Sequence, residues 1–135
     1  MARILIAEDV RTNQLILMAM LRQMGHTVTT ASNGREAITA AEHQIPDVIL
    51  MDMEMPVVNG WIATAYLQKQ PALAHIPVIA LTGHTTAHEL DQALAAGCVA
   101  CLSKPIKRER LLAALDPYVR DCTPVLQATS TSTSG

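Results

Sequence analysis

Three carboxylates, a hydroxyl and an amine stand at the ends of short apolar runs in this 135-residue chain. Glu8 and Asp9 follow the first run, Asp52 ends the third, Thr82 closes the fourth, and Lys104 follows the fifth. Parallel strands end at one edge of a sheet, so we expect these side chains to converge there. Close carboxylates repel by about 4 kcal/mol per pair at an effective dielectric constant near 20. One lysine cannot neutralise three acids, so the cluster calls for a hard cation with oxygen ligands, for which Mg²⁺ is the best match.

The same residue types are those that phosphoryl transfer to a carboxylate requires. Asp52 is the predicted nucleophile, because it sits at the mouth of a run that otherwise reads as a fully buried strand. The cation and Lys104 would offset charge on the phosphoryl oxygens, and Thr82 would donate a hydrogen bond. Gly83, directly after Thr82, leaves the approach to the acid open. The predicted product is an aspartyl phosphate.

These residues need a sheet of parallel strands to bring them together. Apolar residues without alternation over 48–51 indicate a strand that is covered by helices on both faces. The expected strands are 3–7, 27–31, 47–51, 78–81 and 99–102, and the expected helices are 10–24, 33 to about 43, 61–70, 86–96 and a last one after Pro105. In the fourth helix, we expect Ala87, Leu90 and Leu94 to face the sheet. The pattern predicts one doubly wound α/β domain over residues 1–120.

Composition excludes several other classes of protein. A formal charge of -2, two Tyr, one Trp and no Phe give neither a basic surface nor stacking platforms for nucleic acid. The chain lacks a signal peptide pattern and an apolar run of the roughly 20 residues that span a bilayer, so we expect a cytoplasmic protein without direct membrane contact. Residues 121–135 are expected to form a disordered tail or linker.

Cysteines and histidines offer weaker signals. Cys98 and Cys101 have thioredoxin-like spacing, but they lead into a strand, where positions three apart point to opposite faces. Two small buried side chains are therefore favoured over a redox pair. His84 and His88 are four residues apart and could bind a metal, although a solvated helix face is favoured.

Taken together, the motifs resemble the receiver domain of two-component response regulators, over roughly residues 2 to 120. They comprise the acidic pair, Asp52 in a D-x-x-x-P context, the threonine that closes the fourth strand, and Lys-Pro after the fifth. The resemblance implies a flavodoxin-like sheet with strand order 2-1-3-4-5. It implies that Asp52 accepts a phosphoryl group from a phosphohistidine on a histidine kinase or a histidine phosphotransfer protein.

The resemblance also implies individual roles for the site residues. Asp9, Asp52 and the backbone carbonyl of Glu54 would bind Mg²⁺, and Glu8 would act through water. Thr82 and Lys104 would contact the phosphoryl oxygens, and the Lys104-Pro105 peptide bond would be cis. The sequence around these motifs is most similar to the receivers of hybrid histidine kinases. Cys101 stands where the family usually has an aromatic residue, and this difference favours a phosphorelay protein over a switch for an attached effector domain. His84, two residues after Thr82, would tune the lifetime of the phosphoryl group.

Three other functions are considered beside the phosphoacceptor. A phosphohydrolase with an aspartyl phosphate intermediate would use Glu54 as its general acid, but no substrate-capping insertion is present. A flavodoxin-like nucleotide or flavin binder would need a phosphate loop where Glu8 and Asp9 stand. A degenerate receiver that only docks would not need the complete set of acids, threonine and lysine. A monomer is favoured, and dimerisation through the Leu94 to Leu115 side stays open.

Overall fold

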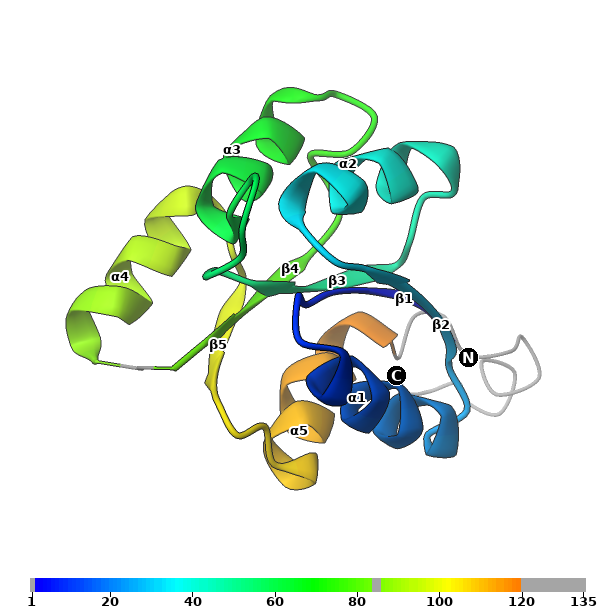
Figure 1. Cartoon of the computed structure of the whole chain (residues 1–135). Helices are drawn as coiled ribbons and strands as arrows, with labels where there is room; N and C mark the ends of the chain where they lie inside the picture. The colour runs from blue at the N-terminus through cyan, green and yellow to red at the C-terminus, as the bar shows by residue number, and fades with distance from the viewer. Residues whose placement is uncertain (1, 84–85, 120–135) are drawn as a thin grey trace, which may run out of the picture.

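Five strands and five helices alternate in a computed structural model, which describes residues 2–83 and 86–119 (Figure 1). The strands are β1 (Arg3–Ala7), β2 (Thr27–Ala31), β3 (Val48–Asp52), β4 (Val78–Thr82) and β5 (Ala100–Ser103). The helices are α1 (Arg11–Gln23), α2 (Gly34–His43), α3 (Gly60–Lys69), α4 (Ala87–Ala96) and α5 (Arg108–Val119). The strand predictions are therefore confirmed to within one residue at each end. The predicted tail at 121–135 lies outside the described residues.

The strands form one parallel sheet in the order β2-β1-β3-β4-β5, which confirms the flavodoxin-like order. Asp52 is in register with Leu81, and Thr82 is in register with Ser103. The ends of β3, β4 and β5 therefore lie at one edge of the sheet. The strand order switches direction at β1 and β3, because β2 lies on one side of this pair and β4 and β5 lie on the other. Open α/β sheets bind ligands at such a switch point.

Both faces of the sheet are covered, as the unbroken apolar strands predict. Helices α1 and α5 cover one face, and α2, α3 and α4 cover the other (Figure 1). Alternate residues of each strand enter opposite cores: Ile4 and Ile6 pack with α1 and α5, while Leu5 and Ala7 pack on the other side. Every residue of β3 and β4 is buried. Among the described residues, no helix is long and apolar enough to cross a bilayer.

Polar caps begin three of the helices. Asn33 Oδ1 accepts a hydrogen bond from the Glu36 amide at 2.9 Å, and Thr86 Oγ1 accepts one from the Glu89 amide at 3.2 Å. Asn59 Oδ1 caps α3 in the same way. The Glu36 carboxylate accepts a hydrogen bond from the amide of Ser32 at 2.8 Å. Caps of this kind typically contribute about 1 kcal/mol each.

The predicted apolar face of α4 is wrong. Ala87 is exposed, and Leu90 and Leu94 are 39% and 48% exposed, while Ala93 is the buried residue of the helix. One stripe along the helix contains Leu90, Ala93 and Leu94. The small Ala93 lies at the centre of that stripe and lets the helix approach the core, so that the two leucines flank the contact and keep much of their surface.

Candidate functional site

The three predicted acids do converge at the sheet edge. Glu8 follows β1, Asp9 follows Glu8, and Asp52 ends β3. One carboxylate oxygen of each lies within 4.8 Å of the other two. Glu8 and Asp52 are fully or almost fully buried, at 0% and 1% exposure, whereas Asp9 is exposed at the mouth of the cluster. Two buried acids and one solvent-facing acid therefore share one small space.

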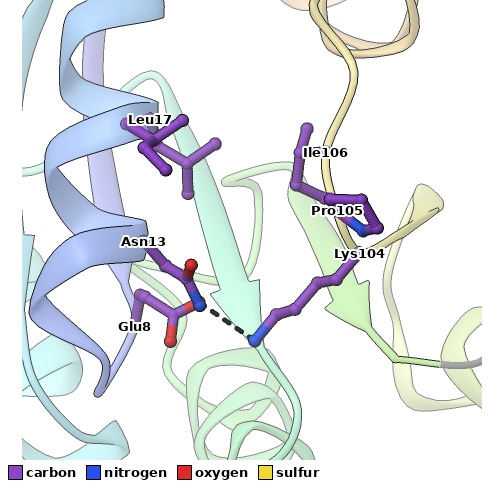
Figure 2. Close-up of a pocket in the computed structure, with 7 residues that line it drawn as sticks. Glu8, Asn13, Leu17, Lys104, Pro105 and Ile106 are labelled. Carbon is purple, nitrogen blue, oxygen red and sulfur yellow. Dashed lines mark ion pairs between the residues drawn. The ribbon is translucent and has the colours of Figure 1, made fainter.

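Lys104 supplies the positive charge of the cluster. Its Nζ lies 2.8 Å from Asp52 Oδ2 and 3.0 Å from Glu8 Oε1. Its backbone amide donates to the Thr82 carbonyl at 2.8 Å, which ties the end of β5 to the end of β4. The side chain reaches across from the loop after β5 to Glu8, below the first turns of α1 (Figure 2). The Lys104-Pro105 peptide bond is cis, as the resemblance implied.

The charges inside the cluster do not cancel. Burial raises the pKa of Glu8, against the opposing effects of the Val10 amide and Lys104. Burial would lower the pKa of Lys104, but hydrogen bonds and charge from Asp52 and Glu8 outweigh it and leave the pKa above its ordinary value. Within the part of the chain that the structure describes, the buried Glu8 Oε1 receives no hydrogen bond of good geometry, although Lys104 Nζ is 3.0 Å away. Three hard oxygen donors with one lysine therefore suit a divalent cation such as Mg²⁺.

The remaining predicted residues surround the Asp52 carboxylate. The Glu54 amide donates to Asp52 Oδ1 at 3.0 Å, so the chain after β3 folds back over the acid. Thr82 is 5% exposed at the end of the neighbouring strand. Among the described residues, a methyl group added at Gly83 would meet only Glu54 Oε1, at 3.9 Å, which is an ordinary contact. His84 lies outside the described residues, so its predicted role stays a prediction.

A family model of the response regulator receiver domain matches residues 4–116, which is most of the chain. The chain belongs to this family. Protein PilH of Pseudomonas aeruginosa is 42% identical to this receiver over 114 residues, covering 83% of this chain and 93% of PilH.

Two solved structures extend the comparison. One is the receiver domain of the sensor histidine kinase PA1611 from Pseudomonas aeruginosa, with a magnesium ion in its active site cleft. It is 37% identical, with a TM-score of 0.81 and coverage of 88% of this chain and 98% of that one. The other is a chain from the Saccharomyces cerevisiae complex of the phosphotransfer protein Ypd1 with the Ssk1 receiver domain. It is 27% identical, with a TM-score of 0.83 and coverage of 91% and 92%. The special likeness to hybrid kinases stays a prediction.

A glycine of the receiver fixes the backbone beneath Asp52. The Gly60 amide donates to the Met53 carbonyl at 3.2 Å, and a Cβ at Gly60 would lie only 2.3 Å from the Asp52 carbonyl oxygen. We expect Gly60→Ala to lower the free energy of unfolding by about 2 kcal/mol, because two backbone segments must move apart. Denaturant unfolding measures this, with Gly83→Ala as the control that meets only an ordinary contact. Equal stability of the two variants would contradict the close packing.

The cysteine pair of the receiver is part of the core. Cys98 precedes β5 and is 4% exposed, and Cys101 packs against the same cluster. The prediction of opposite faces is therefore wrong, because only Cys101 lies on the strand. Burial raises the pKa of both thiols, and the charge of Glu89 adds to the effect at Cys101. A raised pKa is the opposite of what a reactive thiolate requires.

Burial of Cys98 predicts a loss of stability in alkali. Its pKa is raised from 9.0 to about 11, so the native protein keeps a proton that the unfolded chain releases. This contribution is fully present below pH 9 and is lost as the pH rises from 9 to 11. Between pH 8 and 10 the free energy of unfolding should fall by about 1 kcal/mol more in the wild type than in Cys98→Ala. Denaturant unfolding at both pH values checks this, and equal falls would refute it.

Sequence reasoning missed two features of the receiver site. Gln14, on α1, is buried and donates to the Glu8 carbonyl at 2.6 Å. Its signal was a polar residue at the head of the buried stripe that continues with Leu17 and Leu21. A small cavity of about 80 Å³ also opens beside Lys104 (Figure 2). Its lining includes Asn13, Ile16, Leu17, Pro105 and Ile106.

Proposed function

We propose that this receiver is a phosphoacceptor that takes a phosphoryl group from a phosphohistidine onto Asp52 and passes the signal on. The single observation that carries this proposal is the ion pair of Lys104 Nζ with Asp52 Oδ2, 2.8 Å apart inside a cluster of three acids. An acid used only for structure would need one partner. Here one lysine faces two buried carboxylates and a third acid lies beside them, which favours the binding of a cation in the cluster.

The residues around Asp52 can carry out the transfer. A carboxylate oxygen of Asp52 forms the new bond to phosphorus while the bond from phosphorus to the histidine nitrogen breaks, and the imidazole keeps that electron pair. Lys104 shifts from the carboxylate to a phosphoryl oxygen, and the Thr82 hydroxyl donates to another. The Glu54 amide already donates to Asp52 Oδ1 and orients the carboxylate. Spontaneous hydrolysis of the acyl phosphate would then reset the domain slowly.

Mg²⁺ is the cofactor that the acids would hold. Asp9, Asp52 and the Glu54 carbonyl would bind it directly, and Glu8 would act through water. When bound, the ion supplies positive charge that stabilises the phosphoryl oxygens during transfer. The magnesium ion in the related PA1611 receiver supports this assignment.

A histidine kinase or a histidine phosphotransfer protein is the proposed partner, and the cytoplasm is the proposed compartment. The complex of Ypd1 with the Ssk1 receiver domain supports a partner of this chemistry. The Lys104 side chain is 24% exposed, so the phosphoryl group of a docked partner could reach the buried carboxylate beside it.

Intact-mass spectrometry after incubation with acetyl phosphate tests the proposal. We expect one phosphoryl adduct on the wild type with Mg²⁺, and none without Mg²⁺ or in Asp52→Asn. Asp91→Asn, which alters an exposed acid on α4, is the matched control and should behave like the wild type. Equal phosphorylation of Asp52→Asn would refute the proposal. Steady turnover of a phosphomonoester would favour the phosphohydrolase alternative instead.

A further inference from the structure

We propose that Gln14 is a positioning residue for the acidic loop that carries Glu8 and Asp9, and that its side-chain amide sets the affinity of the site for Mg²⁺. This inference rests on the proposed function, in which the loop supplies ligands to the cation. Gln14 itself touches neither the cation nor the phosphoryl group. It would act through the backbone of Glu8.

The amide of Gln14 joins three segments of the chain. The side chain is on a residue only 3% exposed, and its Nε2 donates to the carbonyl of Glu8 at 2.6 Å. The same nitrogen lies 3.3 Å from the carbonyl of Ala31, at the end of β2, and 3.4 Å from Ser32 Oγ. On its other side, Oε1 accepts from Arg11 Nη1 at 2.8 Å. Since carbonyl oxygens only accept, these neighbours fix which end of the amide faces the loop.

The loop has few other restraints. Three residues, Glu8, Asp9 and Val10, connect β1 to α1. Val10 occupies the N-cap of α1, where its side chain forms no capping hydrogen bond. The Glu8 amide donates to the Ala31 carbonyl at 3.0 Å, and the Val10 amide donates to Glu8 Oε2 at 3.0 Å. The side chain of Gln14 therefore adds a hydrogen bond between the helix and the loop, where the Val10 side chain offers none.

The bond to the Glu8 carbonyl bears directly on Asp9. That carbonyl belongs to the peptide unit that leads into Asp9, so its rotation would move the Asp9 carboxylate at the mouth of the cluster. Without the amide, the buried Glu8 carbonyl would lack its closest donor, and the peptide unit would turn toward water. Residues that hold metal ligands in place through hydrogen bonds commonly change metal affinity by 10–100-fold. We expect an effect of about tenfold here, because one of three acids moves.

Calorimetric titration with Mg²⁺ alone tests the inference on the full chain. Gln14→Met keeps the length of the side chain and removes the amide, and Gln14→Asn keeps an amide that is one methylene too short to reach Glu8. The matched control is Thr64→Val, because Thr64 is also fully buried but lies on α3, across the sheet from α1. An osmolyte keeps any weakened variant folded during the titration. Denaturant unfolding reports the stability of each variant separately.

The expected result is a Kd for Mg²⁺ about tenfold higher in both Gln14 variants and unchanged in Thr64→Val. A purely structural role would lower the stability of both Gln14 variants and leave the affinity of the folded protein for Mg²⁺ unchanged, and this outcome would overturn the inference. If the wild type itself bound no Mg²⁺, both the proposed metal site and the inference about Gln14 would be wrong. Binding by the wild type with equal affinity in the Gln14 variants would overturn the inference alone.

Discussion

Replacing Lys104 with methionine is expected to slow Mg²⁺-dependent phosphorylation of Asp52 by about a hundredfold. Methionine keeps most of the side-chain volume but removes the ammonium group that lies 2.8 Å from Asp52 Oδ2. Preorganised donors of this kind typically contribute a hundredfold or more to a reaction in which charge develops on oxygen. The rate of adduct formation with acetyl phosphate, followed by intact mass, is the measurement.

The same variant should lose stability in the absence of a divalent cation. Without Lys104, two buried carboxylates, Glu8 and Asp52, face each other with no positive charge between them. The free energy of unfolding should fall by about 2 kcal/mol, and added Mg²⁺ should recover part of it. Lys107→Met is the control, because Lys107 is exposed and makes no ion pair within the described residues. If Lys104→Met and its control phosphorylate equally fast, the lysine has no part in the transfer.

Asp9→Asn is expected to raise the Kd for Mg²⁺ by about 100-fold, because a direct ligand should contribute at least as much as a residue that only orients one. Asp9 is the exposed member of the acidic cluster, and its carboxylate contacts neither Lys104 nor Asp52 in a hydrogen bond or ion pair that the structure describes. Loss of the Asp9 carboxylate should therefore weaken the binding of Mg²⁺ without removing a hydrogen-bond donor to the phosphoryl group. Calorimetric titration gives the affinity.

Saturating Mg²⁺ should bring the phosphorylation rate of Asp9→Asn back to near that of the wild type. Glu42→Gln, an exposed acid on α2, controls for the change of one negative charge and should leave both quantities unchanged. A variant that binds Mg²⁺ normally would remove Asp9 from the ligand set. A variant that stays slow at saturation would give Asp9 a further role in the transfer.

The convergence of the candidate site residues could be predicted from the sequence because these residues mark the ends of strands. Asp52 and Lys104 are 52 positions apart, yet each follows an apolar run, and parallel strands deliver their ends to one edge. The order of the strands could not be derived this way. Every strand is apolar enough to occupy several places in the sheet, so the order came from the family resemblance and was then confirmed.

Details that depend on side-chain packing could not be predicted from the sequence. The periodicity of α4 indicates a stripe but not its centre, and the small Ala93 rather than the larger leucines makes the contact. In the sequence, Gln14 looks like any polar residue on a helix. The three hydrogen-bond acceptors around its side-chain amide come together only in the folded chain. The contact of Lys104 with Glu8 as well as Asp52 also depends on the reach of one long side chain from the loop after β5 to the ends of β3 and β1.

Chemical trapping of the phosphorylated residue tests the central claim most directly. The domain is phosphorylated with Mg²⁺, treated with sodium borohydride, which reduces an acyl phosphate to an alcohol, and mapped by tandem mass spectrometry. We expect homoserine at position 52 and at no other carboxylate. Reduction at Glu8 or Asp9 with position 52 intact would contradict it, because the buried Asp52 carboxylate would then not be the phosphoacceptor.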